Sequence, residues 1–211
     1  FLFIIFAYLL FKTNDNLILK DLNFSFLNDN ITLGKFSLIF SFFSLIIFMN
    51  AFNMFDGINL QASLYSIFIF LIFISKNYFT NFSIIIIISL TFFLYLNYKN
   101  ICFLGDSGSL LIAFLISYIF INSATKNIFF ADEIFLIMLL PGVELIRLFF
   151  SRIMKKKSPF SPDNNHLHHY LIKNLGLIKT NFSVISVTVS LYLIALSINY
   201  FPISIFIGVI F

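Results

Sequence analysis

The chain has 211 residues, of which 60% are hydrophobic and only 10% are charged. Soluble domains usually carry about 25% charged residues, so this composition excludes that class and indicates a polytopic membrane protein. The net charge of +4 reports orientation in a lipid bilayer rather than a nucleic-acid partner, and the single cysteine, Cys102, excludes an internal disulfide framework.

Long apolar runs recur along the chain, separated by short polar segments. A membrane-spanning helix needs roughly 20 apolar residues, with about 17 as a lower limit. The sequence therefore predicts an all-α polytopic membrane protein with about seven to eight transmembrane helices, in one domain over residues 1–211. The runs are 1–11, 36–52, 62–75, 82–98, 110–122, 134–150 and 182–200, with a return over 203–211 after Pro202.

Two polar segments separate these runs most clearly. Segment 12–35 holds short alternating pieces at 18–26 and 31–33 around Asn28-Asp29-Asn30, which predicts a small β-hairpin outside the membrane. Segment 151–180 has the densest Lys and Arg and all three histidines, so the positive-inside rule predicts a cytoplasmic loop. Counting back through the spans puts segments 50–61, 103–109 and 158–169 on that same face, and 126–133 on the other.

The first candidate site is a polar stripe at the end of an apolar run. Asn50, Asn53 and Asp56 recur at spacings of three, so we expect them to share one helix face and to bind a polar ligand or a cation. The alternative is a helix C-terminal cap that ends in Gly57. A cap does not account for two further amides in a helix that is otherwise rich in Phe, Ile and Leu.

The second candidate site is the turn Phe103-Leu-Gly105-Asp106-Ser107-Gly-Ser109. Its glycines permit close backbone approach or positive φ, and free N–H groups at a helix start, together with Ser107 and Ser109, can cradle a phosphate. Asp106 could hold a Mg²⁺ that bridges to this phosphate. Asp106 or Ser107 can also be the N-cap of a helix that we expect to start at Gly108. A trypsin-like nucleophile in Gly-Asp-Ser-Gly is excluded, because that fold is a soluble barrel with its His upstream.

The third candidate site is the histidine cluster after Pro159-Phe-Ser-Pro-Asp163. His166 and His169 lie three residues apart, which is one helical face, and His168 is close by. Beside the basic residues at 155–157, this cluster is suited to a diphosphate. A zinc site is the competing interpretation and would need a fourth ligand. A solvated basic loop at the lipid surface would explain the lysines but not the clustered histidines.

A charged pair is predicted inside the sixth apolar run. Glu144 and Arg147 are three residues apart near its cytoplasmic end. We expect a structural pair in which the arginine reaches toward the interface, with a substrate role as the alternative.

Three ordered motifs resemble the signatures of the polyprenyl-phosphate N-acetylhexosamine-1-phosphate transferases, glycosyltransferase family 4. They are Asn50-Ala-Phe-Asn-Met-Phe-Asp-Gly, Phe103-Leu-Gly-Asp-Ser-Gly-Ser, and Ser158-Pro-Phe-Ser-Pro-Asp followed by His-Leu-His-His at 166–169. The last is similar to the branch that uses UDP-N-acetylglucosamine-type donors, the undecaprenyl-phosphate alpha-N-acetylglucosaminyl 1-phosphate transferases. The resemblance covers essentially the whole chain.

The resemblance implies a Mg²⁺-dependent transfer, with Mn²⁺ as a substitute, of sugar 1-phosphate from a UDP-N-acetylhexosamine to undecaprenyl phosphate. UMP is released, and the reaction starts a cell-envelope polysaccharide at the bacterial inner membrane, with the active site cytoplasmic. By resemblance, Asp106 is the metal ligand, Asn53 and Asp56 shape the floor of the site, and Phe103 and Gly105 lie near the uridine. The histidines at 166, 168 and 169 face the donor diphosphate. Direct attack and an aspartyl-covalent path both stay open.

Two departures from the family pattern concern acids. The family has an adjacent aspartate pair on an earlier helix, and none occurs in this sequence. Asp132-Glu133 falls on the opposite face by the count above. We therefore expect an N-terminally truncated fragment that is inactive alone and whose Asp106 binds metal weakly or not at all. Asn59 also replaces a second acid of the first motif, so that acid's role does not carry over.

A non-enzymatic membrane transporter or lipid-binding module is the alternative function. Transporters usually place ionisable residues near the bilayer midplane, whereas these acids lie at span ends. A separation of Asp56 and Asp106 beyond about 20 Å, or two helix diameters, would favour this alternative. The sequence leaves the sugar, the polymer and the oligomeric state open, a homodimer included.

Overall fold

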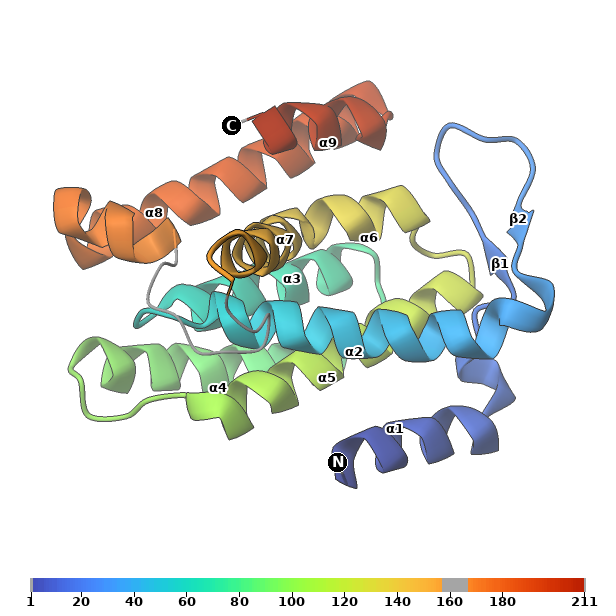
Figure 1. Ribbon diagram of the computed structural model, residues 1–211, viewed down its shortest axis with the longest axis horizontal. Coiled ribbons are helices and arrows are strands. Elements are labelled where there is room, and N and C mark those ends of the chain that lie inside the picture. The colour runs from blue at the N-terminus through green and yellow to red at the C-terminus, as the bar shows by residue number, and fades with distance from the viewer. Residues whose placement is uncertain (1, 157–166, 211) are drawn as a thin grey trace.

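The fold is taken from a computed structural model that describes residues 2–156 and 167–210. It is a helical bundle with one small hairpin (Figure 1). The helices are α1 (Leu2–Thr13), α2 (Ser37–Phe55), α3 (Gln61–Ser75), α4 (Thr80–Tyr98), α5 (Gly105–Thr125), α6 (Ala131–Ile137), α7 (Leu139–Met154), α8 (Leu167–Ile198) and α9 (Phe201–Ile210), with 3₁₀ turns η1 (Asp15–Leu17) and η2 (Gly34–Phe36).

The hairpin was predicted correctly. Its strands β1 (Asp21–Leu22) and β2 (Ile31–Thr32) are antiparallel, and Asp21 is paired with Thr32. The loop between the strands is fixed to the start of α6. The Ser25 N–H donates to Asp132 Oδ1 at 3.0 Å, and the Ala131 N–H donates to the Asn23 carbonyl at 2.7 Å. These bonds define the hairpin end of the bundle.

Successive helices run between the hairpin end and the opposite end, which we call the turn end. The turn end holds the α2–α3 turn (residues 56–60) and the α4–α5 turn (residues 99–104). Asn97 hydrogen-bonds to both of these turns. At the hairpin end, Lys76 after α3 pairs with Glu133 of α6. The α2–α3 and α4–α5 turns therefore lie at one end, as expected, and 126–133 lies at the opposite end, while most of segment 158–169 is outside the described residues.

The all-α membrane class is confirmed, but the predicted number of spans was too high. Within the described residues, four helices are long and apolar enough to cross a membrane, or five if α6 and α7 together form one span. The expected spans at 62–75 and 203–211 are shorter apolar helices. α3, with 15 residues, still connects the two ends of the bundle.

The bend in the sixth expected span has an identifiable cause. α6 and α7 meet at Met138 with 70° between them. Pro141 has no N–H, so the Ile137 carbonyl four residues earlier loses its helical donor. The buried Tyr65 hydroxyl of α3 donates to this carbonyl instead. A hydrogen bond from a neighbouring helix thus satisfies the backbone that proline frees.

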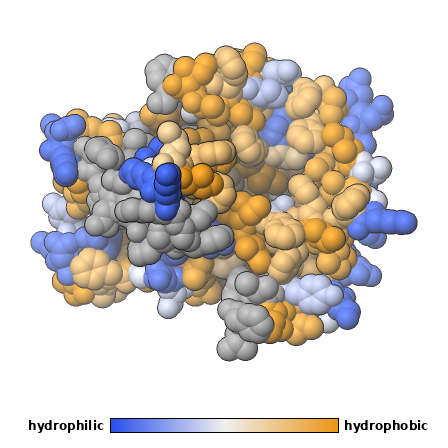
Figure 2. Space-filling view, in the orientation of Figure 1, coloured by the Kyte–Doolittle hydropathy of each residue, from blue (hydrophilic) through white to orange (hydrophobic). Residues whose placement is uncertain are grey.

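Aromatic side chains fill the interior. Phe73 of α3 packs edge-on against Phe120 of α5, with ring centroids 4.9 Å apart, and against Phe129 at 5.9 Å. Apolar side chains also cover much of the outside. Figure 2 shows them over the middle of one face, while hydrophilic residues gather toward its two ends, as expected for a bundle that lies in a bilayer.

Candidate functional site

Asp56 ends helix α2 at the turn end. It is the C-cap residue, with φ −76° and ψ 63°, and its N–H donates to the Phe52 carbonyl at 3.1 Å. The capping role considered above is therefore real. In the α2–α3 turn the residue with positive φ is Leu60, just before α3, at φ +74°. Gly57 does not have a positive φ.

Asp106 lies in the first turn of α5, where its negative charge suits the helix dipole. The helix starts at Gly105, not at the expected Gly108, and its N-cap is Leu104. The expectation that Asp106 or Ser107 is the N-cap was wrong. Gly105 begins the helix with φ +63°, which a residue with a side chain rarely adopts. The conformational freedom of glycine therefore lets the helix start three residues before the expected position.

The first two motifs meet across α2 and α5. The Ser109 hydroxyl, which is fully buried, donates to Asn53 Oδ1. One turn further on, burial and, to a lesser extent, the nearby Asp106 carboxylate raise the pKa of Asp56 to about 6. The two carboxylates are therefore close enough to interact electrostatically, at a site that also contains the start of α5.

The remaining candidate residues of these two motifs differ in their surroundings. Phe103, Gly105 and Ser107 are exposed beside Asp106. Asn50 is exposed as well, but its amide donates to the Ile46 carbonyl of its own helix at 2.9 Å. Each residue of an α-helix advances about 100° around the axis, so a step of three residues falls about 60° short of a full turn. Asn50 and Asp56 are two such steps apart, and their side chains therefore lie about 120° apart around the axis of α2.

The histidine motif lies mostly outside the described residues. His166 is not described, and neither are the side chains of His168 and His169. The predicted pair on α7 is confirmed. Arg147 makes two hydrogen bonds to Glu144, from Nε at 2.9 Å and from Nη2 at 2.8 Å, and the glutamate is buried.

A group of asparagines at the turn end was missed by the sequence analysis. Asn97 accepts from the Leu60 N–H and donates to the Cys102 carbonyl. Asn59 donates to Asn100 Oδ1 at 2.6 Å, and Asn181 of α8 donates to the Asn59 carbonyl at 3.0 Å. The only signal in the sequence was the presence of asparagines in an otherwise apolar chain. Their burial and their partners are set by the fold and cannot be read from the sequence.

The two acids provide a suitable donor set for Mg²⁺. This ion usually takes one or two carboxylates and completes its shell with water and substrate oxygens. Asp106 is exposed, Asp56 is half-buried beside it, and a divalent cation would relieve their mutual repulsion. Within the part of the chain that the structure describes, no group of three or more His, Cys, Asp or Glu could form an all-protein metal site.

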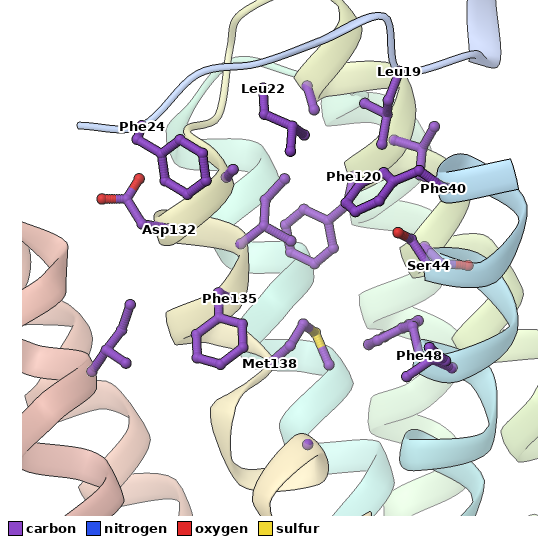
Figure 3. A pocket seen from close by; sticks show the side chains of 18 of the residues that line it. Leu19, Leu22, Phe24, Phe40, Ser44, Phe48, Phe120, Asp132, Phe135 and Met138 are labelled. Carbon is purple, nitrogen blue, oxygen red and sulfur yellow. The ribbon is translucent and has the colours of Figure 1, made fainter. Parts of the chain in front are cut away.

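An apolar cavity of about 750 Å³ lies between the hairpin end and the middle of the bundle. Figure 3 shows Leu22 and Phe24 of the hairpin segment above it and Phe48 of α2 on one side. Phe135 of α6 and Met138, where α6 meets α7, lie on the other side. The lining also includes Ala51 of α2, which is five residues before Asp56. At the rise of a helix, this is about 7.5 Å along the axis.

Comparison with known proteins gives consistent results. The chain is similar to the undecaprenyl-phosphate alpha-N-acetylglucosaminyl 1-phosphate transferase of Escherichia coli O157:H7, with 29% identity over 174 residues, 75% of this chain and 47% of the relative. For the Thermotoga maritima protein of the same name, identity is 32% over 102 residues, 47% of this chain and 33% of the relative. The chain thus spans at most about half the length of these curated relatives.

The sequence model of one family matches residues 1–124 of the 211. This range contains α2 and the α2–α3 turn with Asp56, and it contains the start of α5 with Asp106. Because the match covers more than half of the chain and both turns of the candidate site, the protein belongs to glycosyl transferase family 4.

Proposed function

We propose that the full-length protein transfers an N-acetylhexosamine 1-phosphate from a UDP-sugar to undecaprenyl phosphate, releases UMP and starts a cell-envelope polysaccharide. The observation that carries this proposal is the meeting of Asp56 and Asp106 at one end of the bundle. Family membership and the names of the relatives support the reaction class.

The turn end has several groups that suit a phosphoryl transfer. The N-terminus of α5, with the exposed Ser107, offers backbone N–H groups and a favourable dipole to an anionic diphosphate. A Mg²⁺ bound by Asp106 and Asp56 would neutralise charge on the phosphoryl oxygens. Because the pKa of Asp56 is about 6, its side chain is mostly ionised at neutral pH and can accept a cation or a proton.

The acceptor's hydrocarbon chain has a suitable place in the apolar cavity. The cavity is lined almost entirely by apolar side chains of α2, α5, α6 and α9, and it extends to Ala51, near the Asp56 end of α2. A polyprenyl chain in this cavity would leave its phosphate near the turn end. Lys155 and Lys156, directly after α7, are exposed. In the bacterial inner membrane, these lysines support a cytoplasmic position for the C-terminal end of α7.

The test is transfer of labelled sugar 1-phosphate to undecaprenyl phosphate by the full-length protein in nanodiscs. We expect transfer that requires Mg²⁺ and that falls at least 100-fold in Asp106→Asn, the size of effect typical for a lost electrostatic contact in a transition state. Asp29→Asn is the matched control, because Asp29 is exposed on the hairpin loop at the other end. Transfer without a divalent metal, or full activity of Asp106→Asn, would rule out the proposal.

A lipid-binding module without catalysis is the second candidate, which the apolar cavity favours. The two acids are close together rather than separated by the two helix diameters that would have favoured it. Binding of undecaprenyl phosphate with no release of UMP under the conditions above would select this candidate.

A further inference from the structure

Asn97 lies where the two turns of the candidate site meet. It belongs to the last turn of α4, and it is only 4% exposed. Both ends of its amide are used. Oδ1 accepts a hydrogen bond from the Leu60 N–H at 2.7 Å, and Nδ2 donates to the Cys102 carbonyl at 2.8 Å. One side chain therefore holds both turns at once.

The two anchored residues have matched positions relative to the acids. Leu60 follows Asp56 by four residues, and Cys102 precedes Asp106 by four residues. Leu60 also has the left-handed φ of +74°, which is unfavourable for a residue with a side chain unless its surroundings hold it. The bond from Asn97 is one such restraint.

Neighbouring amides reinforce the same contact. Asn59 Nδ2 donates to the Asn97 carbonyl at 3.2 Å and to Asn100 Oδ1 at 2.6 Å. Asn181 of α8 is 2% exposed and donates to the Asn59 carbonyl at 3.0 Å. The α2–α3 turn is thus tied to α4 and to α8.

We propose that Asn97 is a positioning residue, whose amide sets the separation of Asp56 and Asp106 by holding Leu60 and Cys102 together. This inference rests on the proposed function for its catalytic consequence. Groups that act on one phosphoryl centre must be placed within a fraction of an ångström, and a shift of about 1 Å can cost about 100-fold in rate. Asn97 acts through the two turns and contacts neither carboxylate.

The experiment measures the geometry and the reaction separately. Nitroxide labels at Gly57→Cys and Ile101→Cys, in a Cys102→Ser background, report the distance between the two exposed turns through dipolar broadening of the spin-resonance spectrum. We expect Asn97→Ala to weaken this broadening in the full-length protein in nanodiscs. In the unlabelled enzyme, kcat for sugar 1-phosphate transfer should fall about 10- to 100-fold, with a smaller change in KM.

The matched control is Asn122→Ala. Asn122 is a half-buried asparagine that accepts a hydrogen bond from the Tyr78 hydroxyl at the hairpin end. We expect this variant to lose stability while its broadening and kcat stay as in wild type. Wild-type broadening in Asn97→Ala, or equal loss of broadening in Asn122→Ala, would overturn the proposal.

A second variant keeps the test decisive if Asn97→Ala does not fold. Asn97→Asp keeps an acceptor for the Leu60 N–H but has no donor for the Cys102 carbonyl, so the broadening should still weaken. Unchanged broadening in this variant overturns the positioning role. The proposed function fails separately, if wild type shows the expected geometry but transfers no sugar 1-phosphate.

Discussion

Replacing Glu133 with alanine would remove the central charge of the hairpin end. Glu133 is completely buried, its Oε1 lies 2.9 Å from Lys76 Nζ, and the same oxygen accepts a hydrogen bond from the Tyr192 hydroxyl at 2.9 Å. The three residues join α6, the end of α3 and α8. The substitution would leave Lys76 and Tyr192 without this partner.

The expected loss follows from the burial of each group. Breaking a buried ion pair by removing one partner costs about 3–5 kcal/mol, because the remaining charge is uncompensated. Lys76 is 29% exposed and its ammonium lies 5.1 Å from the centre of the Phe129 ring, so it can recover part of its solvation. We therefore expect Glu133→Ala to lower the free energy of unfolding by about 3 kcal/mol, the lower end of that range.

Reversible unfolding in mixed micelles, followed by circular dichroism, measures this loss. Glu133→Gln keeps an acceptor for Tyr192 and should lose less. Lys76→Met combined with Glu133→Leu removes both charges and should recover most of the stability, since no buried charge remains. A loss below about 1 kcal/mol in Glu133→Ala, as for an exposed pair, would refute the reasoning, and so would a double variant no more stable than Glu133→Ala.

Three further predictions concern the site and the cavity. Burial and Asp106 raise the pKa of Asp56 from 3.8 to about 6, so the folded state binds this proton more tightly than the unfolded state does. Stability should thus fall by up to about 3 kcal/mol as the pH rises from about 4 to 6, and Asp56→Asn should abolish this fall in pH-dependent unfolding curves. Met138→Trp should narrow the apolar cavity and raise KM for the lipid acceptor about tenfold, while an equal rise in KM for the nucleotide sugar would contradict the assignment. Ser109→Ala should cost about 1–3 kcal/mol in micelle unfolding, because it leaves Asn53 Oδ1 without its donor, and an unchanged value would show that this bond is replaced by water.

The meeting of the first two motifs could be predicted because it depends only on the number of helices between them. Each apolar helix carries the chain to the other end, so the α2–α3 turn and the α4–α5 turn, two helices apart, must return to the same end. This argument does not need the exact length of any helix. It therefore held even though α3, with 15 residues, is shorter than a usual span.

Local geometry was less predictable, because it depends on contacts between distant residues. The start of α5 was placed too late, since a glycine with positive φ gives no hydropathy signal. The bend at Met138 depends on Tyr65 of another helix, although Pro141 alone marked the place. The role of Asn97 depends on two turns that lie on either side of it in sequence.

The two ends of the bundle are held together by different chemistry, and this difference has a consequence for the acids. At the hairpin end, the buried carboxylate of Glu133 is neutralised by Lys76, and that of Asp132 is bound by Ser25. At the turn end, within the described residues, no salt bridge reaches Asp56 or Asp106, and neutral amides hold the turns instead. A lysine in the place of Asn97 could donate to the Cys102 carbonyl but has no acceptor for the Leu60 N–H, and it would also lower the pKa of Asp56 and compete with a bound cation. An amide holds the turns through directional hydrogen bonds and adds no charge. The negative potential of the two acids therefore stays available to a ligand.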